Sequence, residues 1–238
     1  MFFKKKKKEV GSPGVIVANN PTSNISEQYR TIRTNIQFSI VDQKLNTLLV
    51  TSATPSSGKS TTSANLAAAF ASEGIKVLVV STDLRKPILH KVFDEDNVVG
   101  LTNLLTNPEV GLEQVIKKTF VPNLYRLPSG PVPPNPSELL SSNRMNQIIE
   151  EMKTEFDLVV FDSPPLLPVT DAQILAAKVD GTIVVIPQGE VKKNELNQAA
   201  ELLEKVNANV LGTVMNKVER DSDNYYYTIT VKSKEDFK

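Results

Sequence analysis

The most informative segment of this chain is Thr47-Leu48-Leu49-Val50-Thr51-Ser52-Ala53-Thr54-Pro55-Ser56-Ser57-Gly58-Lys59-Ser60. Its apolar first part, residues 47–51, predicts a buried strand. Its last residues, Gly58-Lys59-Ser60, complete the G-x-x-x-x-G-K-S pattern of a loop that binds phosphate between a strand and a helix. Ala53 stands where that pattern has its first glycine, which is a mild departure because alanine is also small.

The chemistry of a triphosphate explains why such a loop needs these residue types. Backbone N–H groups that point inward, followed by a helix N-terminus, offer donors and partial positive charge to crowded phosphate oxygens. Gly58 allows the backbone to approach closely, Lys59 reaches the β- and γ-phosphates, and the Ser60 hydroxyl ligates Mg²⁺. We therefore expect the phosphates of a nucleotide to be surrounded by Pro55, Ser56, Ser57, Gly58, Lys59, Ser60 and Thr61.

Strands and helices alternate along the rest of the chain. The apolar runs 158–161 and 183–186 are typical of strands that are buried on both faces. We predict an α/β protein of the P-loop NTPase fold, with a mainly parallel sheet and helices on both faces. The elements expected after an N-terminal helix at 25–41 are 46–52, 59–73, 76–82, 112–118, 123–128, 137–154, 157–162, 171–178, 181–187, 192–207 and 210–216.

Composition excludes several classes of protein. The 238 residues carry 27 basic and 27 acidic side chains, and this neutrality argues against nucleic acid as the main partner. The chain has no cysteine and one histidine, which excludes thiolate nucleophiles, cysteine zinc sites, iron–sulfur clusters and histidine-cluster metal sites. The apolar runs are too short to span a membrane. The start of the chain, Met1-Phe2-Phe3 and then lysines, does not read as a signal peptide.

The sequence divides into three parts. Residues 1–24 are predicted to be a flexible basic segment, and residues 25–217 a folded domain that begins with the helix at 25–41. The lysine run at 4–8 is either a solvated tail or a segment attracted to anionic lipid or an acidic partner. Residues 218–238 are predicted to be a polar tail, and it carries three of the five tyrosines of the chain. These three are either an exposed cluster or part of a β-prone edge strand.

Two carboxylates are predicted to lie beside the phosphates. Ligands of parallel sheets bind at the carboxyl ends of the strands, and Asp83 and Asp162 each end an apolar strand. A metal-bound triphosphate needs such carboxylates, so Ser60, Asp83 and Asp162 are the predicted metal ligands. Arg85 adds positive charge beside Asp83. The predicted catalytic residues are Lys59, Asp83, Arg85 and Asp162.

Two further groups of residues have predicted roles. Asn216 ends the last predicted strand, which could place its side chain near the base of the nucleotide. Glu27, Arg30 and Arg33 are spaced three residues apart on the predicted first helix, so they share one face of it.

Together these motifs resemble the bacterial tyrosine kinases of capsular and exopolysaccharide synthesis and export. That family has a phosphate-binding loop, here 53–60, a second acidic motif, here 77–85, and a strand that ends in Asp-x-Pro-Pro, here 158–165. Residues 129–139 are similar to a further segment of the family. The tail matches the family's tyrosine cluster. The resemblance covers nearly the whole chain.

The resemblance implies the cytoplasmic kinase subunit of a two-part system that uses ATP and Mg²⁺. It implies a homo-oligomeric ring in which one subunit phosphorylates Tyr225, Tyr226 and Tyr227 of its neighbour. Glu27, Arg30 and Arg33 look like the family's oligomerisation motif. The other implied partners are a cognate tyrosine phosphatase and a separate transmembrane adaptor, which activates the kinase and recruits it to the inner face of the cell membrane. No nucleic acid partner is expected.

Ser81 departs from the family's Asp-x-Asp-x-Arg pattern, of which only Asp83 and Arg85 remain. A serine hydroxyl does not accept a proton as a carboxylate does. Either Asp83 takes both roles, or transfer is slow, or the chain is a regulatory ATP-binding subunit.

Another alternative is an ATPase switch of the MinD or ParA type on the same fold. Thr54 disfavours it, because those proteins carry a signature lysine at this position. The lack of cysteine excludes the function of an iron-protein-like reductase. No small-molecule pocket motif favours a metabolic ligase.

Overall fold

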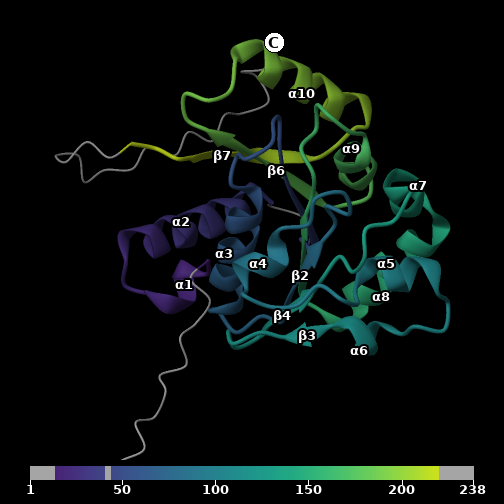
Figure 1. Ribbon diagram of the computed structural model, residues 1–238. Coiled ribbons are helices and arrows are strands. Elements are labelled where there is room, and N and C mark those ends of the chain that lie inside the picture. Colours follow the sequence, from purple (N-terminus) through teal and green to yellow (C-terminus); the bar gives the residue numbers. More distant parts are fainter. Residues whose placement is uncertain (1–13, 41–43, 220–238) are drawn as a thin grey trace, which may run out of the picture.

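The computed structural model describes residues 14–40 and 44–219 (Figure 1). Within these residues seven strands form one sheet in the order β3-β4-β2-β5-β1-β6-β7. All neighbouring strands run parallel except β3 and β4, which are antiparallel. The strands are β1 (Thr47–Ser52), β2 (Val77–Ser81), β3 (Lys117–Lys118), β4 (Leu124–Leu127), β5 (Leu158–Asp162), β6 (Gly181–Pro187) and β7 (Val210–Asn216).

Helices cover both faces of the sheet, as the sequence predicted. Side chains of successive strand residues point to opposite faces, so Leu48 and Val50 belong to one core and Leu49 to the other. The first core packs against α1 (Ile16–Asn19), α2 (Asn24–Ser39), α3 (Lys59–Ala71) and α4 (Leu89–Val92). The second packs against α5 (Leu101–Thr106), α6 (Leu112–Val115), α7 (Pro136–Ser141), α8 (Asn143–Glu155), α9 (Asp171–Ala176) and α10 (Lys193–Lys205).

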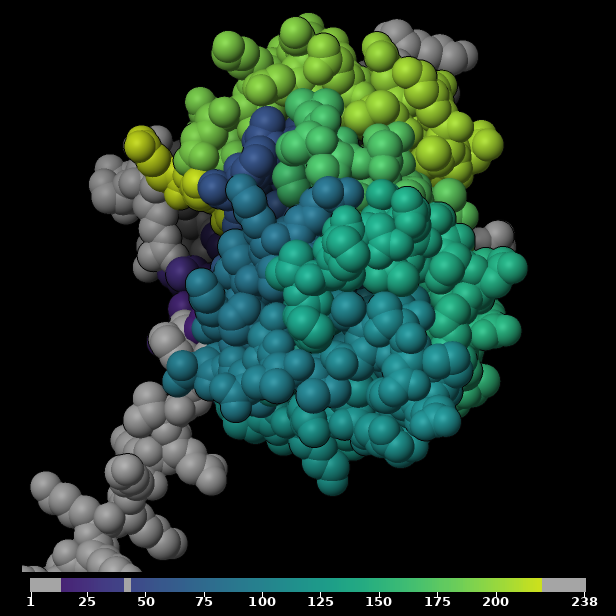
Figure 2. All heavy atoms as spheres, turned by 45° about the vertical axis from the view of Figure 1, so that its right-hand side comes forward, coloured from purple at the N-terminus to yellow at the C-terminus, as the bar shows by residue number. Residues whose placement is uncertain are grey.

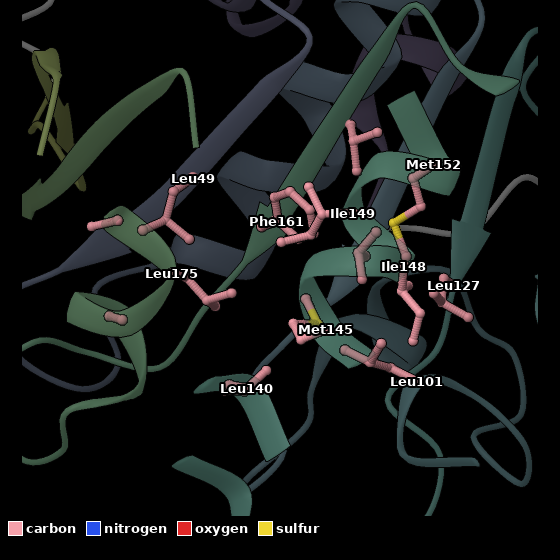
Figure 3. Packing of buried hydrophobic residues seen from close by; sticks show 14 of the residues in the cluster. Leu49, Leu101, Leu127, Leu140, Met145, Ile148, Ile149, Met152, Phe161 and Leu175 are labelled. Atoms are coloured by element: carbon pink, nitrogen blue, oxygen red, sulfur yellow. The ribbon is translucent and has the colours of Figure 1, made fainter. Parts of the chain in front are cut away.

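The second core shows how an amphipathic helix joins the sheet. Met145, Ile148, Ile149 and Met152 recur at helical spacing along α8 and are buried. Figure 3 shows Ile149 beside Phe161 of β5, with the other three side chains of α8 in the same cluster. In Figure 2 residues from the middle of the chain (teal) make up much of the visible face, with the later segments (green to yellow) above them. None of the helices within residues 14–40 and 44–219 has an apolar stretch of the length that a membrane span requires.

The structure corrects the prediction that residues 1–24 are flexible, at least for the part it describes. Residues 14–24 are ordered, and α1 packs on α3 with Val17 buried. The link is made by Asn65 of α3, whose side chain accepts from the backbone N–H of Val17 at 3.1 Å and donates to the carbonyl of Gly14 at 2.8 Å. The lysine run at 4–8 lies outside the described residues.

Three helical regions also differ from the prediction. The helix expected at 137–154 is two helices, because Ser142 adopts an extended conformation and caps α8 by accepting a hydrogen bond from the Met145 N–H. The short helices α4 and α5 lie in a stretch where no element was predicted. The element expected at 112–118 divides into α6 and the two-residue strand β3.

Candidate functional site

The phosphate-binding loop lies between β1 and α3, as predicted. Gly58 is the N-cap residue of α3 and has a left-handed backbone with φ of 86°, which favours glycine. A side chain here would also collide with Asn216, because a Cβ atom would lie 2.1 Å from its Nδ2. Asn216 donates to the carbonyl of Ser57 at 2.9 Å. The structure therefore places Asn216 against the loop itself, where it braces the turn. The role predicted for it at the base stays a prediction.

Asp162 occupies the carboxyl end of β5, between β1 and β2 in the sheet. Its carboxylate is buried and faces α3, where Ser63 donates to Oδ1 at 3.2 Å. The pKa of Asp162 is raised to about 6, mainly by burial and also by the charge of Asp83, whereas hydrogen bonds from Ser60 and Ser63 and the charge of Lys59 oppose the rise. Its second oxygen, Oδ2, is buried and has no hydrogen-bond partner among the described residues.

These contacts fit a magnesium ion. A buried carboxylate oxygen without a partner, beside the Ser60 hydroxyl, supplies the hard oxygen donors that Mg²⁺ prefers. Within the described part of the chain no group of three or more His, Cys, Asp or Glu side chains is placed to hold a metal. Protein carboxylates alone therefore do not complete a coordination sphere, and nucleotide phosphate oxygens and water are the expected remaining ligands.

Lys59 is the buried cation of the site and is only 8% exposed. Burial lowers its pKa, and the negative charges of Asp162 and Asp83 oppose this effect. Lys59, Asp162 and Asp83 are therefore electrostatically coupled, as expected for side chains around one ligand. The phosphate-loop residues, the lysine and both predicted carboxylates thus meet at one end of the sheet.

The loop after β2 carries Asp83 and Arg85. Asp83 Oδ1 accepts the backbone N–H groups of Arg85 at 3.2 Å and Lys86 at 2.9 Å, which fixes the turn. The Arg85 side chain pairs with Asp171, the first residue of α9. Sequence reasoning missed Asp171, because an acidic residue at the start of a predicted helix is ordinary there and carries no other signal.

Ser81 lies where the resemblance expects the missing aspartate. It is paired in register with Asp162 on the neighbouring strand, and with Val77 and Val79 it belongs to the face of β2 that packs toward α3. Its Oγ is buried and has no hydrogen-bond partner among the described residues. An aspartate at this position would place a second buried carboxylate next to Asp162. Because residue 81 is a serine, Asp162 is the only acidic residue of the pair that Ser81 and Asp162 form across the two strands.

The predicted oligomerisation residues are largely engaged within the chain. Arg30 pairs with Glu27 at 2.6 Å. Arg33 donates to the carbonyl of Ala69 in α3 at 3.0 Å and pairs with Glu73, in the turn that follows α3, at 2.7 Å. Arg33 therefore holds α2 on α3, while Glu27 keeps a side chain that is 64% exposed. The predicted phosphate acceptors Tyr225, Tyr226 and Tyr227 lie outside the described residues.

A cavity of about 420 Å³ lies elsewhere, at the amino-terminal ends of β1, β2 and β5. This is the opposite end of the sheet from the phosphate loop, so the cavity is separate from the site of Lys59 and Asp162. Its lining residues are Gln37, Ile40, Lys44, Leu45, Phe70, Gly74, Ile75, Asp157 and Leu158.

The pKa of Asp162 gives the site a pH dependence. Because a carboxylate must be ionised to ligate a cation, we expect Mg²⁺-dependent nucleotide affinity to be full above about pH 7. It should fall as the pH drops through 6, by about tenfold per unit below it. Titrating a fluorescent ATP analogue between pH 5 and 8, with and without Mg²⁺, measures this effect. Asp162→Asn is the control, since the pH dependence of the nucleotide itself remains in that variant. An identical magnesium effect at every pH would contradict the assignment.

Comparison with known proteins agrees with this geometry. The family model of the AAA domain matches residues 46–217. Tyrosine-protein kinase YwqD of Bacillus subtilis (strain 168) is 46% identical over 215 residues, which are 90% of each chain. The kinase domain of Escherichia coli tyrosine kinase ETK superposes with a TM-score of 0.85 at 33% identity, covering 94% of this chain and 88% of that one.

A more distant similarity concerns the alternative of an ATPase switch. The septum site-determining protein MinD of Pyrococcus horikoshii, solved with Mg-ADP, gives a TM-score of 0.62 at 26% identity, over 74% of this chain and 72% of that one. MinD therefore shares the P-loop architecture, while the kinases match more of the chain at higher identity. The chain belongs to the bacterial tyrosine-protein kinase family.

Proposed function

We propose that the protein uses Mg²⁺-bound ATP to phosphorylate Tyr225, Tyr226 and Tyr227 of a neighbouring subunit, and that this activity regulates capsule or exopolysaccharide synthesis and export. The observation that carries the proposal is the convergence of Lys59 and the free, buried Oδ2 of Asp162 beneath the phosphate loop. Family membership supports tyrosine as the acceptor.

Each side chain of the site has a role in this reaction. The N–H groups of the loop and the ammonium of Lys59 bind and orient the phosphates. Ser60 and Asp162 would hold the cation, which when bound would neutralise charge on the phosphate oxygens. A tyrosine hydroxyl has a pKa near 10 and is a poor nucleophile at neutral pH, so a carboxylate must take its proton. Asp83 is the candidate, in addition to its predicted role as a metal ligand, because its Oδ1 accepts the turn N–H groups while its Oδ2 accepts neither of them.

The partners follow from the family resemblance and not from a contact in the structure. We propose a homo-oligomeric ring, a transmembrane adaptor that activates the kinase at the inner face of the cell membrane, and a cognate tyrosine phosphatase. Within the proposed oligomerisation motif, the exposed Glu27 is the residue best placed to contact a neighbour, since Arg33 is engaged with Glu73.

A regulatory nucleotide-binding role with weak phosphotransfer is a second candidate, and Ser81 is the observation that favours it. Labelled ATP separates the two. We expect label on protein tyrosine in the full chain, and loss of that label in the Tyr225→Phe/Tyr226→Phe/Tyr227→Phe variant with nucleotide affinity unchanged. Tyr125→Phe is the control, because this tyrosine packs against Phe156 within the domain. Label released only as free phosphate would contradict the kinase proposal and support an ATPase.

A further inference from the structure

The two edges of the sheet differ in how well they are protected from pairing. β7 is the last strand in the order, so among the described residues it pairs with β6 on one side and with no strand on the other. β3 forms the opposite edge and consists of two exposed lysines. A very short strand with charged side chains resists pairing with a further strand. β7 has seven residues and no charged side chain, so its edge lacks this protection.

The backbone of β7 carries hydrogen-bonding groups on its unpaired side. Gln188, which follows β6, donates its N–H to the carbonyl of Asn216 at 2.8 Å, so the backbone of Asn216 is directed toward β6. The N–H and C=O groups of successive strand residues point alternately to the two sides of the strand. Those of Thr213 and Met215 therefore point outward, where a further strand can pair with them.

Apolar side chains beside this edge are exposed as well. The side chain of Met215 is 57% exposed, and Val218, just beyond the strand, is 55% exposed. Leu211 and Val214 of β7 instead pack toward the core that α2 and α3 cover. Aromatic and β-branched side chains on an added strand would form cross-strand pairs with the exposed residues. The edge thus offers both backbone groups and apolar surface to a partner strand.

A segment of this chain fits the edge. Residues 225–231, Tyr-Tyr-Tyr-Thr-Ile-Thr-Val, are as many as those of β7, and all of them are aromatic or β-branched. Eight residues, 217–224, connect this segment to the end of β7, and the last four of them, Asp-Ser-Asp-Asn, are types that favour turns. Lys217 has a left-handed backbone with φ of 56°, which bends the chain directly after the strand. So short a connection keeps the segment at a high effective concentration beside the edge.

We propose that the unpaired edge of β7 binds residues 225–231 of its own chain as an added antiparallel strand. The direction follows from the connection, because a parallel strand would need a crossover of a dozen or more residues. The pairing holds Tyr225, Tyr226 and Tyr227 in the sheet and away from the phosphate site of a neighbouring subunit, and so restrains their phosphorylation. This consequence rests on the proposed function, whereas the pairing itself does not.

The variant Thr228→Pro/Ile229→Pro tests the pairing and leaves the described residues unchanged. Adjacent residues direct their N–H groups to opposite sides of a strand, so one of the two prolines removes a hydrogen bond to β7 in any register. Ser233→Pro/Lys234→Pro is the matched control, because it makes the same change beyond the pairing segment. The control should behave as the unchanged protein does.

Hydrogen exchange of single backbone amides, followed by NMR on the nucleotide-free full chain, measures the effect. We expect the amides of Thr213 and Met215 to exchange about tenfold more slowly in the unchanged protein than in Thr228→Pro/Ile229→Pro. The Val214 amide is the internal reference, since it already points to β6. Equal exchange of Thr213 and Met215 in the two proteins would overturn the proposal. Slowing that grows with protein concentration would assign the added strand to a second copy and would also overturn it.

Disulfide formation tests the geometry independently. The natural chain has no cysteine, so engineered cysteines report only the contact of interest. Met215→Cys is combined in turn with one cysteine at each position from 225 to 231. Because successive side chains of a strand point to opposite faces, every second position should react and those between should stay reduced. Lys117→Cys, at the opposite edge, is the control and should react with none.

Uniform reaction along the segment, or no reaction at any position, would refute the added strand. Both measurements are made without nucleotide, so their outcome does not depend on whether the chain phosphorylates tyrosine. A failure of the proposed function and a failure of this pairing are therefore seen in separate experiments.

Discussion

Lys59→Met is expected to lower the affinity for MgATP by about 100-fold and to reduce tyrosine phosphorylation to background. The lysine would make charge-assisted hydrogen bonds to phosphate, worth about 3 kcal/mol together. Its loss also removes the cation that opposes protonation of the buried Asp162, so the pKa of that carboxyl should rise further. Both effects weaken the binding of a magnesium-bound nucleotide.

The measurement is a titration with a fluorescent ATP analogue, followed by a phosphorylation assay on the same samples. Lys205→Met is the matched control, because Lys205 is an exposed lysine at the end of α10, far along the chain from the phosphate loop. Unchanged affinity and phosphorylation in Lys59→Met would refute the assignment of the phosphate-binding loop.

Asp162→Asn has the second large expected effect. It should lower the rate of phosphotransfer and raise the stability of the nucleotide-free protein. Magnesium-dependent phosphotransfer should fall on the order of 10²- to 10³-fold, because the amide has no charge for the cation. The pKa of Asp162 is raised from 3.8 to about 6, so the folded state favours the neutral form. Above pH 6 the ionised carboxylate therefore costs the nucleotide-free protein up to about 3 kcal/mol, which the amide avoids.

Thermal unfolding at pH 7.5 measures the effect of this substitution on stability. The nucleotide-free Asp162→Asn protein should melt several degrees higher than the unchanged protein, at roughly 2–4 °C per kcal/mol for a chain of this size. The extra stabilisation by MgATP should be lost. The control is Asp157→Asn, directly before the first residue of the same strand, where the carboxylate accepts the Lys76 N–H. A variant that keeps full magnesium-dependent activity would show that another residue holds the metal.

The central part of the fold follows from the sequence because its strands are apolar on both faces. Runs such as 158–161 have no polar side to expose, so they indicate a parallel sheet covered by helices. Local signals fail where tertiary contacts decide. Val15 and Val17 belong to an apolar run of only four residues between Gly, Pro and Asn residues, and Asn65 of α3 holds this segment through Gly14 and Val17. The break between α7 and α8 depends on the local conformation of Ser142.

The residues of the site also fall into those that the sequence predicts and those that only the structure reveals. Gly58, Lys59, Ser60 and Asp162 could be predicted because each stands at a fixed place in a strand–loop–helix pattern. Asp171 could not, since its importance comes from a contact with a side chain that is remote in sequence. Arg33 is the opposite case. Its place in a motif suggested a contact between subunits, whereas in the structure its side chain pairs with Glu73 of the same chain.

The most direct test of the account is calorimetric titration of the full chain with ATP, with Mg²⁺ and after its removal by a chelator, in the presence and absence of a candidate adaptor's cytoplasmic tail. The buried carboxylate and lysine at the end of the sheet predict saturable binding of one nucleotide per chain that weakens strongly without the metal. A chain that takes up no nucleotide under any of these conditions would contradict the account at its base.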